Sequence, residues 1–151
     1  MKKLSLFKCT ALLAGILTAG AANAALVGQW SADEFVIKSN TPPTQPGTLI
    51  NKVGYCLKSD NTYYVTAQLY GSVAGSGKWT QSGKKVFLHG NFGRTNEYMQ
   101  AGEMNRVDST HLTGNWQLWT LPTNPDYRDQ YISSQWKYVG ATCLPPAPNS
   151  Y

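Results

Sequence analysis

The sequence has few of the residues on which most enzyme active sites depend. It contains two histidines, His89 and His111, and no G-x-S-x-G motif to present a nucleophilic serine. Asp33 and Glu34 are adjacent, so on a strand their carboxylates would face opposite sides and could not form a glycosidase pair. The glycine-rich segment 71–77 lacks the Lys-Ser/Thr pair of a phosphate-binding loop. These absences predict that the chain is not an enzyme and uses no cofactor.

The apolar run at 10–19 is shorter than the roughly 20 residues that a membrane-spanning helix needs. It follows a start with lysines and precedes the small-residue pattern A-x-A at 22–24, which is typical of a cleavage site. We therefore predict a secretory signal peptide over residues 1–24, a mature protein that is periplasmic or secreted, and no transmembrane anchor after processing. The alternative is that this segment is retained as a membrane anchor.

Positive charge is also scarce outside this predicted signal peptide. The whole chain has a formal net charge of +5, but without residues 1–24 ten Lys and Arg stand against eight Asp and Glu. Such a small surplus gives no reason to predict a nucleic-acid partner. The remaining length fits one domain, which we place at residues 25–143, with a proline-rich, flexible tail at 144–151.

Three cysteines occur, and Cys9 would be lost with the signal peptide. Cys56 and Cys143 remain, and an even number in an exported chain predicts one disulfide. The alternative is a pair of reduced core thiols. A metal site is not predicted, because His89 or His111 would have to join two cysteines without the usual paired spacing.

Helical periodicity is absent after residue 24, and alternation typical of strands takes its place. The proline-rich segment 39–48 cannot be a central strand and is predicted to be a long loop. The spacing predicts an all-β protein: a single antiparallel barrel or strongly curved sheet of about eight strands. Strands or hairpins are expected at 26–30, 34–38, 53–60, 61–70, 78–92, 103–120 and 130–140.

Gly28-Gln29-Trp30 is similar to the G-x-W motif on the first strand of lipocalin-like barrels. Asp126-Tyr127 resembles part of that family's second motif, T-D-Y. In the family, the tryptophan closes the base of the barrel and a large loop follows the first strand, where residues 39–48 would lie. The sequence shows no helix after the last strand and no equivalent of the third motif's arginine. The resemblance therefore implies a small lipocalin-like (calycin-type) barrel and no particular ligand.

Aromatic residues are abundant, with five tryptophans and nine tyrosines. On a strand, the stretch HLTGNWQLWT at 111–120 would place Trp116 and Trp119 on opposite faces. Trp116 shares its face with leucines and is predicted to be core, whereas Trp119 shares its face with Thr, Asn and Gln. Trp119 is therefore predicted to face outward at a binding surface. The predicted binding residues are Trp119, Tyr127, Arg128, Tyr64 and Tyr70.

Two functions fit these features. The first is a binding protein that recognises a protein partner in the periplasm or outside the cell through the aromatic surface, as an inhibitor or immunity module does. The alternative is a carrier of a small apolar molecule inside the barrel. We favour the first, because large inward-facing side chains would fill a short barrel. The large side chains expected to point inward are those of Leu69, Leu112, Trp116 and Leu118.

Overall fold

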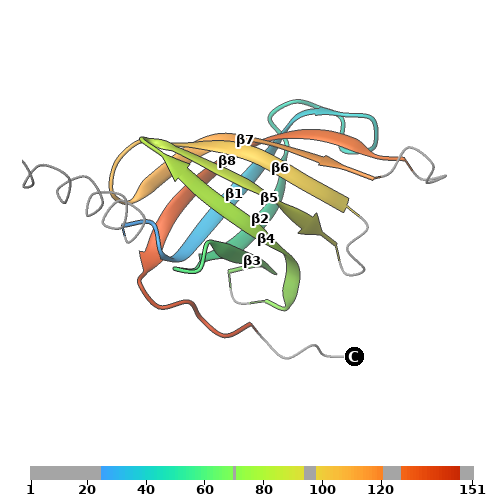
Figure 1. Cartoon of the computed structure of the whole chain (residues 1–151). Helices are drawn as coiled ribbons and strands as arrows, with labels where there is room; N and C mark the ends of the chain where they lie inside the picture. The colour runs from blue at the N-terminus through green and yellow to red at the C-terminus, as the bar shows by residue number, and fades with distance from the viewer. Residues whose placement is uncertain (1–24, 70, 94–97, 121–126, 147–151) are drawn as a thin grey trace, which may run out of the picture.

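The computed structural model describes residues 25–69, 71–93, 98–120 and 127–146, which form a closed antiparallel β-barrel (Figure 1). Each strand pairs with the next along the chain, and β8 pairs with β1 to close the barrel. The strands are β1 (Gly28–Ser39), β2 (Leu49–Leu57), β3 (Thr62–Ala67), β4 (Val73–Ser82), β5 (Lys85–Phe92), β6 (Tyr98–Arg106), β7 (His111–Trp119) and β8 (Asp129–Gly140). The predicted all-β class, antiparallel pairing and strand number are confirmed.

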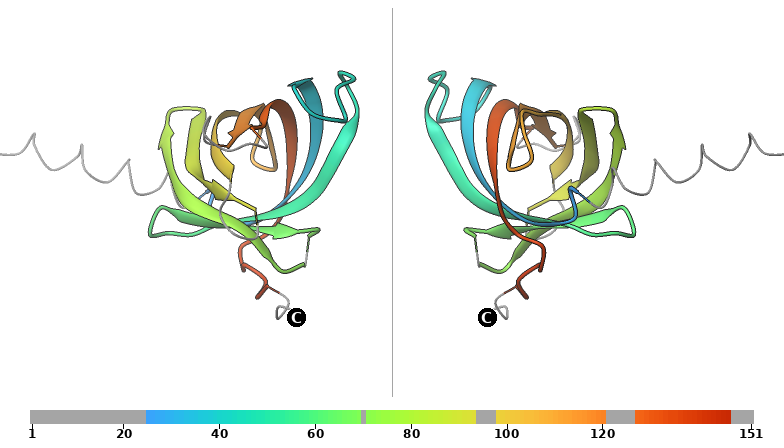
Figure 2. Two further views of the ribbon diagram at one scale, coloured as in Figure 1. Left: turned by 90° about the vertical axis from the view of Figure 1, so that its right-hand side faces the viewer. Right: turned by 90° about the vertical axis from the view of Figure 1, so that its left-hand side faces the viewer.

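No helix occurs within the described ranges, and thus none there is long and apolar enough to cross a membrane. The predicted signal peptide at 1–24, Tyr70, Asp126 and residues 147–151 lie outside these ranges. The two views of Figure 2 show the strands curving around a common axis, with residues 141–146 leaving the barrel after β8.

Strand alternation selects which side chains fill the barrel. On β8, Ile132, Ser134 and Trp136 are buried, while Tyr131, Gln135 and Lys137, which point to the other face, are exposed. The same two-residue period buries Leu112, Trp116 and Leu118 on β7. Because successive side chains of a strand point to opposite faces, the buried set lies inside the barrel. The sequence prediction that Trp116 is a core residue is confirmed.

The chain enters β1 at one end of the barrel, which we call the base. The β2–β3, β4–β5 and β6–β7 turns lie at this end, because the strands run alternately up and down. Trp30 and Trp79 are fully buried near the base, and each indole N–H donates to a backbone oxygen there, of Leu26 and Lys58 respectively, at 3.0 Å. The tryptophan of the G-x-W motif therefore occupies the place that the lipocalin resemblance implies.

The structure changes the expected boundaries of β3 and β4. β3 ends at Ala67, because Gln68 takes a positive φ of 63° and breaks the strand that was expected to reach residue 70. Leu69 consequently lies in the β3–β4 connection instead of filling the interior. β4 begins at Val73, earlier than expected. The two segments expected at 26–30 and 34–38 are parts of the single strand β1.

The predicted disulfide between Cys56 and Cys143 is confirmed. It joins Cα atoms 5.5 Å apart across a sequence separation of 87 residues. The chain after it lies against the outside of the barrel, because Tyr64 Oη donates to the Leu144 carbonyl at 2.6 Å and the Leu144 N–H donates to Gln29 Oε1 at 3.3 Å. The start of the predicted tail is therefore in contact with β1 and β3.

Candidate functional site

A carboxyl group is buried inside the barrel. Glu34 follows Trp30 and Ala32 on the inward face of β1 and is 2% exposed. One carboxylate oxygen accepts a hydrogen bond from Tyr55 Oη at 3.0 Å, and the other accepts from Asn51 Nδ2 at 3.1 Å. Buried carboxylates are rare in protein interiors and usually have a specific partner or task. Its neighbour Asp33 points outward and pairs with Lys52 at 3.0 Å.

The polar contacts continue across the barrel to β6. Gln100 Nε2 donates to Tyr55 Oη at 2.8 Å, and Tyr63 Oη donates to Gln100 Oε1 at 3.5 Å. Four strands contribute to this set, which we call the interior polar cluster: Glu34, Asn51, Tyr55, Tyr63 and Gln100. Antiparallel pairing of β1 with β2 and of β2 with β3 brings three of the strands together, and barrel closure places β6 opposite them.

Burial controls the protonation of the cluster. Burial raises the pKa of the Glu34 carboxyl above 4.5, and the hydrogen bonds from Asn51 and Tyr55 oppose that shift only partly. Burial, and then the charge of Glu34, raises the pKa of Tyr55 well above its ordinary value. Burial also raises the pKa of Tyr63. Both phenols therefore keep their protons at neutral pH and act as donors.

Aromatic rings lie directly beside the polar cluster. The Tyr55 ring stacks on Trp136 at a centroid distance of 4.1 Å and on Trp116 at 5.6 Å, with an interplanar angle of 9° in the second pair. Trp116 and Trp136 are 5.8 Å apart. We call these three rings the aromatic wall. Stacked rings of this kind offer flat apolar area with polar edges.

One indole N–H group in the aromatic wall has no hydrogen-bond acceptor among the described residues. The indole N–H groups of Trp30, Trp79 and Trp136 each donate to an oxygen, in the last case Ser134 Oγ at 2.8 Å. Trp116 is 2% exposed, and its Nε1 has no hydrogen-bond partner among the residues that the structure describes. A buried donor without an acceptor costs about 1–3 kcal/mol, so it marks a place where a ligand or a water would be stabilising.

Glycines make room for the wall and the cluster. A Cβ at Gly102 on β6 would lie 2.3 Å from Trp116 Cε3, so the indole can cover the strand only because no side chain is present. A Cβ at Gly90 on β5 would lie 2.8 Å from Tyr63 Oη. Both aromatic side chains reach the interior across backbone that any larger residue would block.

The outward surface around Trp119 contains several of the predicted binding residues. Trp119 is half-buried on the outer face of β7, opposite Met99 on β6 and Asp129 on β8. Tyr127 is 40% exposed, and the guanidinium of exposed Arg128 lies 5.9 Å from the Tyr98 ring centroid.

The remaining predicted binding residues are not part of that surface. Tyr64 faces outward on β3, four strands away from β7 around the barrel, and bonds the segment that follows the disulfide. Tyr70 lies outside the described residues. The structure thus brings Trp119, Tyr127 and Arg128 to one region and separates Tyr64 from them.

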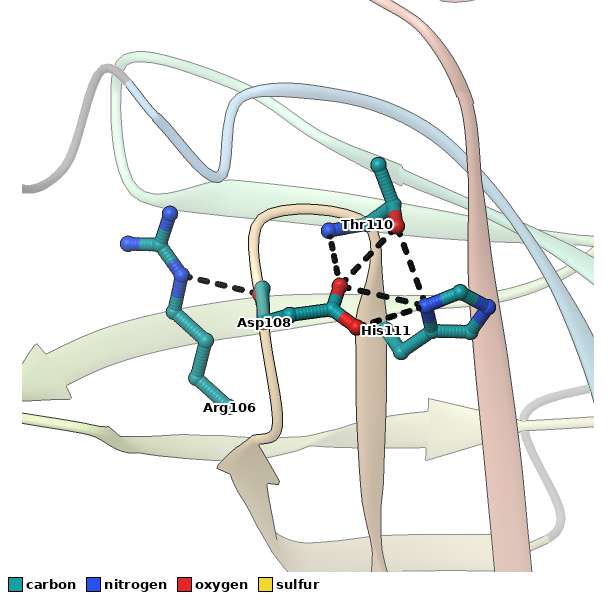
Figure 3. A network of polar contacts seen from close by, with 4 residues as sticks. All are labelled: Arg106, Asp108, Thr110 and His111. Atoms are coloured by element: carbon teal, nitrogen blue, oxygen red, sulfur yellow. Dashed lines mark hydrogen bonds and ion pairs between the residues drawn. The ribbon is translucent and has the colours of Figure 1, made fainter.

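A second polar network occupies the β6–β7 turn (Figure 3). Asp108 Oδ1 accepts from the Thr110 N–H at 2.6 Å, and His111 Nδ1 lies 3.0 Å from both Asp108 Oδ2 and Thr110 Oγ1. In a catalytic triad the carboxylate and the hydroxyl contact different ring nitrogens, whereas here both contact the same one. We interpret the network as a turn cap. Within the described ranges, no group of three or more His, Cys, Asp or Glu could hold a metal ion.

Comparison with known proteins supports the fold alone. No protein-family model and no curated protein matches the chain. Among solved structures, the chain is similar to EF1p2_mFAP2b bound to DFHBI, with a TM-score of 0.56, 13% identity and coverage of 81% of this chain and 100% of that one. It is also similar to the redesigned β-barrel b11L5F_LGL, with a TM-score of 0.50, 12% identity and coverage of 79% and 96%. The likeness supports the fold, a small closed antiparallel β-barrel.

The interior polar cluster was missed by the sequence analysis. The signal for Glu34 was present: once Trp30 is placed inside the barrel, the period of two puts Ala32, Glu34 and Val36 on the same face. Gln100 carried no comparable signal, because its neighbours do not alternate clearly and its partner Tyr55 lies 45 residues away in sequence.

Proposed function

We propose that this protein is a binding protein that holds a small planar molecule inside the barrel, against the aromatic wall and the interior polar cluster. The observation that carries the proposal is the buried Trp116 N–H without an acceptor, beside a buried carboxyl group and stacked rings. Pockets for small ligands combine mostly apolar walls with a few polar groups that fix orientation. The similar barrel of EF1p2_mFAP2b, which holds DFHBI, supports this choice.

Calorimetric titration with DFHBI and with naphthalene-2-carboxamide tests the proposal. Trp116→Phe keeps an aromatic ring but removes the N–H, so it should weaken binding by about tenfold, as expected for one lost hydrogen bond. Trp119→Phe makes the same chemical change on the outer face of the same strand and should leave binding unchanged. Equal effects of the two substitutions, or binding of neither compound, would contradict an interior site.

A binding role is favoured over catalysis, because in the network of Asp108, Thr110 and His111 the carboxylate and the hydroxyl contact the same ring nitrogen, unlike in a catalytic triad (Figure 3). We place the protein in the periplasm or outside the cell, since a disulfide is typical of oxidising compartments. Mass spectrometry of the processed protein should find Ala25 at its N-terminus if residues 1–24 are a cleaved signal peptide.

A protein partner is the second candidate, and the exposed aromatics near Trp119 favour it. Tyr127 and Tyr131 are each 40% exposed. Tyr131 is a diagonal neighbour of Trp119 on the outer face, since Trp119 lies opposite Asp129. An inhibitor or immunity module would use such a patch as its energetic centre, with Arg128 at the rim. Trp119→Ala should then abolish capture of the partner without weakening small-molecule binding inside the barrel.

A further inference from the structure

The buried carboxyl group of Glu34 has no cationic partner in the described part of the chain. Its hydrogen bonds come from two neutral side chains, Asn51 and Tyr55. The other polar side chains buried in the described ranges are neutral as well: Gln29, Thr66, Gln100, Thr120 and Ser134. The ion pairs found there join outward-facing or turn residues, none of them Glu34. A carboxylate taken out of water requires a compensating positive charge or must accept a proton.

Electron-rich rings lie beside the Glu34 carboxyl group. Tyr55 bonds Glu34 through its hydroxyl and stacks on Trp116 and Trp136 through its ring. The faces of tryptophan and tyrosine carry negative potential and attract cations, most strongly when both are desolvated. The Glu34 carboxyl group and the aromatic wall therefore favour the same sign of charge, a positive one, in a molecule that contacts both.

We propose that the molecule bound inside this barrel is a planar organic cation with N–H donors and a neutral acceptor atom, such as a quinoline carboxamidine, whose donors bond the Glu34 carboxylate while its ring packs against Tyr55 and Trp116. This inference rests on the proposed function, and it adds the charge and shape of the ligand. A flat cation with two N–H groups matches the two carboxylate oxygens in the bidentate way that guanidinium groups do.

Binding of a cation would be coupled to the protonation of Glu34. Burial raises the pKa of Glu34 in the free protein, so the carboxyl takes up a proton more readily than an exposed one. A cation beside it favours the ionised form, so cation binding and loss of a proton from Glu34 favour each other. The titratable groups that contact the cluster from the packed strands are Tyr55 and Tyr63, which stay neutral in this range.

Three compounds of nearly the same shape but different charge separate the effect of ligand charge on affinity from the effect of ligand shape. Quinoline-3-carboxamidine is a cation, quinoline-3-carboxamide is neutral and quinoline-3-carboxylate is an anion at neutral pH, and all three share the ring nitrogen as an acceptor. Isothermal titration of the purified protein with its disulfide intact should give the amidine an affinity at least about tenfold above the other two. The chain's net charge is positive, so non-specific attraction would favour the carboxylate instead.

Two neighbouring carboxylates provide the matched variants. Glu34→Gln should reduce the preference for the amidine to near unity, whereas Asp33→Asn, which removes the same charge on the outside of β1, should preserve it. Comparable affinity for all three compounds in the wild-type protein would overturn the ligand class and leave the interior site standing. Binding of none would overturn both proposals. The wild-type comparison decides the question even if Glu34→Gln does not fold.

Discussion

At the scale of single residues, the two tryptophans of β7 have the same chemistry and opposite environments. Trp116 is 2% exposed and contacts Tyr55, Trp136 and the bare backbone of Gly102. Trp119, three residues on, is half-buried on the outer face. Alternation along one strand is therefore enough to give one ring a role in packing and leave the other available to a partner.

Alanine substitutions should separate these roles. Trp116→Ala removes a buried aromatic side chain and should lower the free energy of unfolding by about 3–5 kcal/mol. Trp119→Ala removes a partly exposed ring and should cost about 1 kcal/mol. Urea unfolding of both variants, followed by circular dichroism, measures the difference. Equal losses would mean that Trp119 is also structural and that the outer face of β7 is covered.

Glu34 should make stability depend on pH in a recognisable direction. Its folded-state pKa is raised by burial above 4.5, so the folded protein binds more protons than the unfolded chain once the pH exceeds that value. The contribution is present below pH 4.5 and is lost as the pH rises through the folded-state pKa. Urea unfolding from acid to neutral pH should therefore show the wild-type protein losing stability relative to Glu34→Gln. A free energy of unfolding of the wild-type protein that stays constant or increases relative to that of Glu34→Gln as the pH rises would refute this.

At the scale of elements, the turns are stabilised by hydrogen bonds within the turn, and the strands by pairing with the adjacent strands. Asp108 accepts bonds from both the backbone N–H and the hydroxyl of Thr110, which closes the connection between β6 and β7. The β4–β5 turn instead relies on Gly83, which has a positive φ of 59°. Both turns lie at the base, where the hydrogen bonds of Trp30 and Trp79 also anchor the connecting backbone.

The β6–β7 turn should respond to acid. The backbone N–H of Thr110, its hydroxyl and then His111 lower the pKa of Asp108 to about 2. This carboxylate therefore contributes stability above pH 3.8, its ordinary value, and the contribution disappears as the pH falls toward 2. Asp108→Asn should be less stable than wild type at neutral pH, and the two should converge in acid. Ser109→Ala, in the same turn, is the control and should show no such convergence.

Elements with clear alternation could be predicted from the sequence, and those shaped by distant residues could not. β7 and β8 were placed closely because Trp116 and Trp136 stand in regular two-residue patterns. The start of β4 was missed because its glycines read as a loop. Gly77 lies within the strand since the Tyr63 ring packs against it, with Tyr63 Cε1 only 2.8 Å from where its Cβ would be.

The candidate site depends on the same kind of long-range information. The outward residues around Trp119 follow from alternation within one strand, whereas the interior polar cluster exists only after β1, β2, β3 and β6 are paired and the barrel is closed. Glu34 alone was within reach of sequence reasoning. Its contacts with Asn51 and Tyr55 depend on the register between β1 and β2, which a sequence pattern does not specify.

At the scale of the whole molecule, the disulfide joins β2 to the segment that follows β8, and these two parts of the chain are not paired in the barrel. β8 ends at Gly140, and the segment beyond it runs along the outside toward β2 and β3. Cys56 is fully buried, and its outward-facing neighbour Gly54 lies close to Gln29 and Thr66, which are also buried. The bond therefore holds a covering segment over the outer face of β1 to β3.

Loss of the disulfide should lower stability without changing the fold. The bond spans 87 residues, so its removal should raise the conformational entropy of the unfolded chain. The free energy of unfolding should fall by about 4–5 kcal/mol as a result. The double variant Cys56→Ser/Cys143→Ser should keep the far-ultraviolet circular dichroism of a strand protein, since the strand pairing that closes the barrel does not involve the bond. Its urea midpoint should fall with little change in the slope of the free energy against urea concentration, and reduced wild-type protein should behave in the same way.

The variant Tyr64→Phe is the control. It removes only the hydrogen bond to Leu144 and should lower the free energy of unfolding far less. If the double variant were as stable as the oxidised protein, contacts such as that of Tyr64 would hold the segment, and the bond would add little.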